Sequence, residues 1–92
     1  MPKSEQELQA IVTDEVLQWS KKSMQALRYE LAEPIGYERW SSNGYLQFEA
    51  LMLEDTADYI HVSISVDDGS EEWSRSPVCS SFLVHSDGRV DV

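Results

Sequence analysis

The sequence has few bases for its size, and this scarcity limits the partners it can bind. Seven Lys and Arg residues stand against seventeen Asp and Glu residues, so the formal net charge is −10. Such a charge repels phosphate-rich surfaces, and we therefore expect neither nucleic acid nor membrane as a partner. A basic protein partner is electrostatically permitted.

Cysteine and long apolar runs are also scarce. The single cysteine, Cys79, excludes an internal disulfide and a cysteine-based zinc cluster. No apolar run approaches the roughly 18–20 residues of a membrane-spanning helix, and the first residues lack the apolar stretch of a signal peptide. These features predict a protein of the reducing cytoplasm. No histidine or base lies near Cys79 in the sequence, which favours a structural thiol over a reactive one.

What remains is an ordinary globular composition with an uneven charge distribution. The 92 residues, 41% of them hydrophobic, predict a single folded domain over residues 1–92. Residues 47–92 hold ten acids and two bases, whereas residues 1–46 hold seven acids and five bases. The strongly acidic half is also the half in which we expect the strands.

The helical part is predicted over residues 4–33. Ser4 and Glu7 have the spacing of a capping box, in which a hydroxyl and a carboxylate satisfy free backbone N–H groups. Pro34 disfavours helical geometry at the residue before it, so the helix should end there.

The apolar residues of this stretch do not form one stripe. Those of the first part and those of the second part fall on different sides of an ideal helix. This predicts a kink or a break near residues 18–22. An alternative is that the face carrying Leu8, Ile11 and Val12 meets a partner or a second copy.

Residues 35–92 alternate between apolar and polar side chains in short runs, which predicts an antiparallel meander of four or five strands. The predicted strands cover residues 36–40, 45–52, 59–66 and 78–85, with a polar loop over 67–77 and a short fifth strand at the end. The fold class is therefore α+β, with the N-terminal helix packed on one face of the sheet.

Apolar pairs predict the register of the central hairpin. Across a loop over residues 54–58, alternation pairs Met52 with Ile60 and Phe48 with Ile64. Every inner pair is then apolar.

The sequence predicts the register of the last hairpin but not that of the first. The last one should pair Val84 with Val90 and place Gly88 in the left-handed conformation. The first contains an Asn-Gly turn signal, but different loop lengths place either Tyr37 or Trp40 inward. Its register stays open.

Residue patterns for catalysis or metal binding are scarce. His61 and His85 should project from the uncovered sheet face on neighbouring strands, with Glu49 as a third group, but this spacing matches no metal signature. The acidic residues over 67–72 share only composition with a calcium loop. An acid–base pair of Glu38 and Glu49 would need a cleft. We expect no catalytic residues, no metal and no cofactor.

An apolar patch on the uncovered sheet face is the main functional prediction. Leu51, Leu53 and Tyr59 should lie close together there, and Leu83 extends the patch from the neighbouring strand. Trp73, in the polar loop, is either an anchor into the core edge or an exposed binding residue. These features predict a non-enzymatic interaction module for a basic protein partner or a second copy.

Two alternatives stay open. The helix or Trp73 could cover the patch within the monomer. A pocket between helix and sheet could instead make the protein a small-molecule-binding or enzymatic domain, and its aromatic lining would be Trp19, Tyr37, Trp40 and Phe48.

Overall fold

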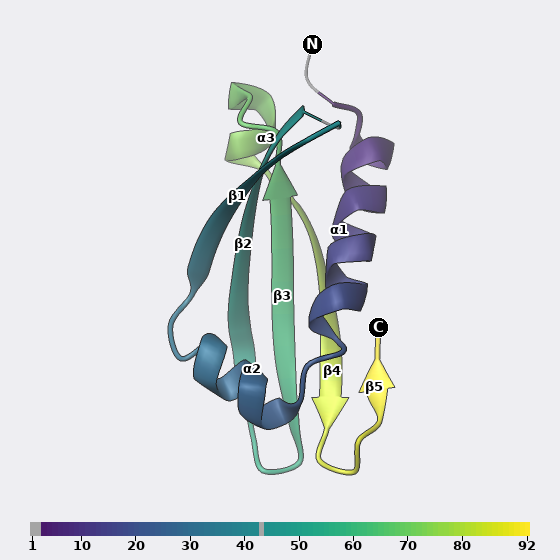
Figure 1. Ribbon diagram of the computed structural model, residues 1–92, viewed down its shortest axis with the longest axis vertical. Helices are drawn as coiled ribbons and strands as arrows, with labels where there is room; N and C mark the ends of the chain where they lie inside the picture. The colour runs from purple at the N-terminus through teal and green to yellow at the C-terminus, as the bar shows by residue number, and fades with distance from the viewer. Residues whose placement is uncertain (1–2, 43) are drawn as a thin grey trace.

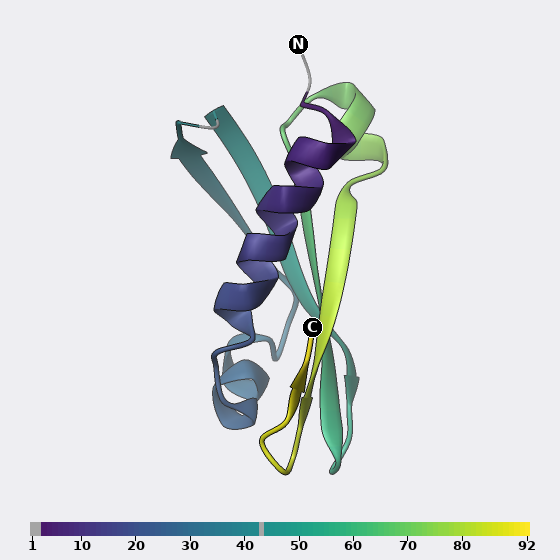
Figure 2. The same ribbon diagram turned by 90° about the vertical axis from the view of Figure 1, so that its right-hand side faces the viewer.

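The computed structural model describes residues 3–42 and 44–92, and it confirms the α+β fold. A long helix packs on one face of an open antiparallel sheet of five strands, which follow one another in chain order (Figure 1, Figure 2). The helices are α1 (Glu5–Trp19), α2 (Met24–Glu30) and α3 (Glu71–Arg75), and the strands are β1 (Ile35–Ser41), β2 (Gly44–Asp55), β3 (Tyr59–Asp67), β4 (Val78–His85) and β5 (Val90–Asp91).

The N-terminal helical part is split at the predicted place, near residues 18–22. Ser4 begins α1 by accepting the Glu7 N–H at 3.1 Å, and Ser23 begins α2 by accepting the Ala26 N–H at 3.1 Å. Because each helix has its own cap, the chain changes direction between them. α1 runs along the sheet, and α2 turns across one end of it (Figure 1).

The split brings both apolar stripes onto the same sheet face. Leu8 and Val12 of α1 are 0% exposed within the chain. The idea that their face meets a partner or a second copy is therefore wrong. Leu27 and Leu31, from the second stripe, are buried in the same core. The sheet contributes alternate residues to this core: Leu46, Phe48, Ala50, Ile60, Val62, Ile64, Val66, Val78, Phe82 and Val84.

The register between β2 and β3 differs from the prediction by two residues. Phe48 lies opposite Val66, where alternation predicted Ile64, and the other pairs move likewise. The register then shifts again between Met52 and Glu54, at a β-bulge. A two-residue shift leaves every side chain on its face, so alternation cannot distinguish the two registers.

The first hairpin resolves the open register in favour of Tyr37. Tyr37 lies opposite Phe48, and their rings stack with centroids 5.1 Å apart on the helix side of the sheet. Trp40 lies opposite Tyr45 on the uncovered face and is 76% exposed. Asn43 of the predicted turn lies outside the described residues.

The last two connections have different outcomes. Val84 pairs with Val90 and Gly88 has a φ of 92°, as predicted. The loop over 67–77 was expected to be irregular, but it contains α3. Ser70 begins this helix by accepting the Trp73 N–H at 3.4 Å. This cap was missed in the sequence because the acidic residues around it were interpreted as a solvated turn.

Candidate functional site

The uncovered face of the sheet carries four of the predicted interface residues. On this face Leu83 lies opposite His61, and His61 lies opposite the bulge that contains Leu53. Leu51 precedes the bulge on β2, and Tyr59 begins β3. Leu53 is 52% exposed, while the other three are half-buried. We call Leu51, Leu53, Tyr59 and Leu83 the leucine patch.

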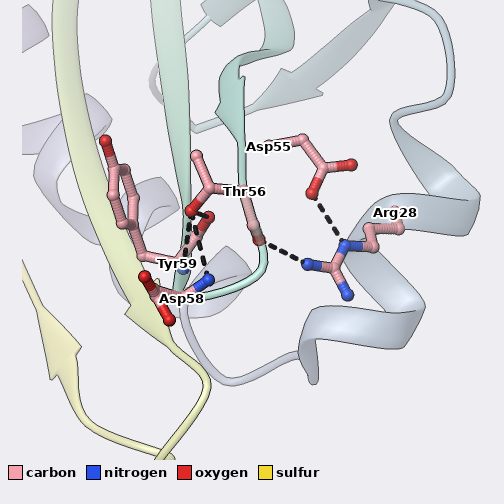
Figure 3. Close-up of polar contacts among 5 residues, drawn as sticks. All are labelled: Arg28, Asp55, Thr56, Asp58 and Tyr59. Carbon is pink, nitrogen blue, oxygen red and sulfur yellow. Dashed lines mark hydrogen bonds and ion pairs between the residues drawn. The ribbon is translucent and has the colours of Figure 1, made fainter.

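The turn beside the leucine patch is held by α2 (Figure 3). Arg28 donates from Nε to Asp55 Oδ1 and from Nη2 to the Thr56 carbonyl, both at 2.9 Å. Within the turn, Thr56 Oγ1 accepts the backbone N–H groups of Asp58 at 3.2 Å and Tyr59 at 3.0 Å. These bonds fix the backbone on both sides of the hairpin, and with it the outline of the patch.

Trp73 belongs to α3, which lies at the opposite end of the sheet from the turn beside the leucine patch (Figure 1). It packs against the core, and its indole Nε1–H donates to the Lys3 carbonyl at 2.6 Å. The Lys3 backbone N–H in turn donates to Asp68 at 2.7 Å. The structure therefore shows Trp73 as an anchor between α3 and the N-terminal segment. The patch stays uncovered by α1, which packs on the other face of β3 and β4.

The two predicted histidines lie on this face, each beside a different carboxylate. His85 Nε2 is 2.8 Å from Asp91 Oδ2, and His61 Nδ1 is 3.8 Å from Glu54 Oε1. Glu49 lies opposite Ser65, away from both histidines along the strands. Within residues 3–42 and 44–92, no group of three or more His, Cys, Asp or Glu side chains is placed to hold a metal ion.

Acidic side chains lie on the same face as the leucine patch, most of them toward the other end of the sheet. Strand alternation places Glu38, Glu49 and Asp67 on the same face, and Glu54 lies in the bulge. None of the described residues that point outward from β1 to β4 is a Lys or an Arg, and Arg89, from the turn between β4 and β5, contacts the His85 ring at the edge of this face. Tyr59 donates its hydroxyl to Glu54 Oε2 at 2.8 Å, and this hydrogen bond raises the pKa of Tyr59, so its phenol stays neutral beside the carboxylate. The face is therefore apolar at one end and mostly negative toward the other.

A second concave site lies on the helix side of the sheet. It is a groove of about 580 Å³ between the end of α1, the connector to α2 and strand β1. Trp19 and Tyr37 line it, as the pocket alternative expected. Trp40 lies on the other face of the sheet, and Phe48 is only 1% exposed, so neither belongs to the lining.

Glu15 is the centre of this groove, and it is the buried charged residue of α1. Its carboxylate accepts the Tyr37 hydroxyl at 2.6 Å and both guanidinium Nη groups of Arg39, at 2.8 and 3.1 Å. The Trp19 indole N–H donates to the Tyr37 oxygen at 2.8 Å. Burial favours a raised pKa for Glu15, but the bonds from Arg39 and Tyr37 outweigh it and the pKa is lowered. Burial and the bond to Glu15 raise the pKa of Tyr37.

The groups of this groove that the sequence reasoning missed are Glu15 and Arg39. One signal was present: Glu15 follows Leu8 and Val12 at helical spacing and so belongs to the buried face of α1. Arg39 follows Tyr37 by two residues on a strand, so both point to the helix side once Tyr37 is inward. That register was open in the sequence, and the pair could not be found without it.

Comparisons with known proteins find no matching family model, no matching curated protein and no matching solved structure. In the described part of the chain, no helix combines the length and the apolar character needed to cross a membrane. Function therefore has to be argued from the leucine patch and the groove.

Proposed function

We propose that this protein is a non-enzymatic interaction module, and that the uncovered sheet face binds a basic, amphipathic segment of a partner protein. The observation that carries this proposal is the leucine patch: exposed and half-buried apolar side chains on a rigid hairpin, within an acidic surface. Apolar contacts of this kind supply affinity when they are buried. The surrounding charge selects the sign of the partner and speeds the encounter.

A basic partner is favoured over a second copy of this chain. Two copies that met through this face would bring two acidic surfaces together, with Arg89 beside His85 as a base at the edge of each. Like charges brought together at an interface cost several kcal/mol. Lysine and arginine side chains would remove that cost.

The side chains on this face also support binding rather than catalysis. Among the described residues, the polar partners of the two histidines are Asp91, Glu54 and Arg89, and none is a serine or Cys79. A nucleophile and a base within hydrogen-bond reach are what covalent catalysis requires. Cys79 is exposed and outside any disulfide, which fits the reducing cytoplasm that we propose as the setting.

Labelled model peptides test this proposal directly. An amphipathic Lys/Leu peptide should bind, as measured by fluorescence anisotropy, and its affinity should fall steeply with added salt. A Lys/Ser peptide of equal charge and a Glu/Leu peptide of equal apolar content should each bind at least about tenfold more weakly. Equal binding of all three would contradict the proposal.

Variants locate the interaction on the leucine patch. Leu51→Asp with Leu53→Asp should abolish binding of the Lys/Leu peptide, and Leu53→Asp alone, at an exposed position, should weaken it without risk to the fold. The matched control is Leu17→Asp, because Leu17 is 42% exposed on α1 and lies away from the patch. Binding that survives in the patch variants, or is lost in the control, would place the interaction elsewhere. A dimer in light scattering that Leu53→Asp dissolves would make the second copy the partner.

A further inference from the structure

The groove on the helix side differs in charge from the rest of the molecule. Its lining contains Lys21, Lys22 and Arg39 and only two carboxylates, Glu15 and Glu30, a local balance of +1. The whole chain has a net charge of −10. Three of the seven bases are therefore gathered around one cavity.

The guanidinium of Arg39 is fixed in position by its contacts with Glu15 and Phe48. It forms a two-point contact with Glu15 and lies over the Phe48 ring, 4.8 Å from the centroid. The side chain is nevertheless 47% exposed. A guanidinium has five N–H donors in a fixed plane, and the contact with Glu15 uses two of them. A positive group with fixed geometry thus faces the groove.

The α1–α2 connector adds two lysine amines to the groove, one in an ion pair and one exposed. Lys22 pairs with Glu30 at 3.0 Å and lies over the Trp19 ring, 5.3 Å from its centroid. Lys21 is exposed, and no ion pair to it occurs among the described residues. Of the two, Lys21 is the amine available to a ligand.

Aromatic and aliphatic side chains make the apolar part of the groove. The Trp19 and Tyr37 rings are 6.3 Å apart and tilted by 38°, and Ile35 lines the groove beside them. The groove is wide open to solvent, and it combines these apolar walls with a few fixed polar groups, as small-molecule sites do.

We infer that this groove is a binding site for a small organic anion that has a planar apolar body and one carboxylate. The body lies against Tyr37, Ile35 and the edge of Trp19, which is 7% exposed and has Lys22 over its ring, and the carboxylate faces Lys21 and the exposed side of Arg39. The carboxylate of Glu15 is already engaged by Arg39 and Tyr37, so it does not offer a site to a cation. This site lies on the other side of the sheet from the leucine patch and is independent of it.

A charge series on one ring system tests the inference. Indole-3-acetate, indole-3-acetamide and tryptamine share the indole and are anionic, neutral and cationic near neutral pH. The net charge of the protein favours tryptamine, so a preference for the anion has to come from a local site. In ¹⁵N NMR titrations, indole-3-acetate should shift the Trp19 indole N–H and the amides of residues 18–22. Indole-3-acetamide should bind about tenfold more weakly, because a charge-assisted contact is lost.

The three tryptophans separate this result from unspecific binding. Trp40 and Trp73 lie outside the groove, so their indole N–H signals should stay in place while that of Trp19 moves. Movement of all three signals, no movement of Trp19 up to the solubility limit of indole-3-acetate, or equal or tighter binding of tryptamine at the same residues would each overturn the inference.

Two substitutions of equal charge change complete the test. Lys21→Gln should weaken indole-3-acetate about threefold or more, as loss of an exposed charge contact does. Arg75→Gln, on α3 at the far end of the molecule, should leave the affinity unchanged (Figure 1). Arg39→Gln should weaken binding most, but it also unpairs Glu15, so Lys21→Gln decides the matter if that variant fails to fold. Equal effects of Lys21→Gln and Arg75→Gln would show that net charge alone is at work.

Discussion

Glu15 shows how one side chain connects a helix to the edge of the sheet. It lies on the buried face of α1, where an apolar residue would be expected, and is 7% exposed. A buried carboxylate is tolerated only when it is paired and hydrogen-bonded. Tyr37 and Arg39 of β1 meet both conditions, so Glu15 joins the first helix to the first strand.

The first prediction removes the charge of Glu15 and keeps its shape. Glu15→Gln should lower the free energy of unfolding by about 1–3 kcal/mol, because bonds from charged Arg39 and from Tyr37 are weakened. Urea denaturation at neutral pH measures this change. Asp14→Asn is the matched control: Asp14 is exposed on the same helix, and its effect should stay within about 0.5 kcal/mol. Equal effects of the two would contradict the role of Glu15.

The second prediction concerns acid. The pKa of Glu15 is below its ordinary value of 4.5 in the folded protein, so the unfolded chain takes up a proton at higher pH than the folded one. The stabilisation from Glu15 is therefore complete above about pH 5 and is lost as the pH falls through the folded pKa. Asp68 and Asp87, whose pKa values are also lowered, act in the same direction. The difference between wild type and Glu15→Gln in urea should therefore shrink as the pH falls, and a constant difference would contradict the assignment.

At the scale of elements, α2 depends on its contacts with the rest of the fold. It has seven residues, fewer than the roughly 12–15 that an isolated helix needs, and of these only Leu27 is buried. Arg28 ties it to the turn after β2 (Figure 3). Both partners of the Arg28–Asp55 pair are about half exposed, so the pair should matter locally rather than globally.

The third prediction follows from this contact. Arg28→Met should change the free energy of unfolding by less than about 1 kcal/mol but speed amide hydrogen exchange in α2 and in the turn. NMR-detected exchange resolves the two effects. Arg75→Met, which removes another exposed pair on α3, should leave exchange in α2 unchanged. If α2 exchanged no faster in Arg28→Met, the helix would be held by Leu27 and Leu31 alone.

The fourth prediction uses the glycines of two connections. Gly69 and Gly88 both have positive φ, so alanine at either should cost about 1–2 kcal/mol. A Cβ at Gly69 would also come within 2.9 Å of the Tyr45 ring, whereas one at Gly88 would meet nothing within 4 Å. Gly69→Ala should therefore be the more destabilising in urea, and Gly36→Ala, without positive φ, should cost least. The reverse order would show that Tyr45 moves aside freely.

Apart from α3, the elements were predictable from the sequence because each depends on local chemistry. The Ser4 cap, the helix break and the alternating strands are all signalled by neighbouring residues. The register of β2 against β3 was not predictable from the sequence. A two-residue shift leaves every side chain on the same face, and the bulge beside Met52 has no local signal. For the same reason the face that carries Leu51, Leu53, Tyr59 and Leu83 could be predicted, since it depends on alternation alone, while their role as an interface stays a prediction. The pairing of Glu15 with Arg39 could not be predicted, because it depends on the register of β1, which the sequence left open.

At the scale of the whole molecule, the charges are unevenly spread in space as well as in sequence. The uncovered sheet face is acidic, and the groove on the helix side carries a small positive balance. The two proposed sites therefore call for ligands of opposite charge on opposite sides of one sheet. Binding to one should leave affinity at the other nearly unchanged at about 0.15 M salt and above, where the long-range attraction between ligands of opposite charge is screened.

The last prediction concerns how far the repulsion among these negative charges lowers the thermal stability of the fold. A net charge of −10 destabilises the compact state through self-repulsion, so the thermal midpoint should rise as NaCl is added to about 0.5 M. Glu49→Gln, on the acidic face, should raise the midpoint at low salt and lose this effect at high salt. Glu5→Gln makes the same charge change in the first turn of α1, where a negative group is stabilised by the helix dipole, and should bring little gain or a loss. If both variants gave the same gain, net charge alone would govern stability; opposite signs would show that the position of each carboxylate decides whether it strains or supports the fold.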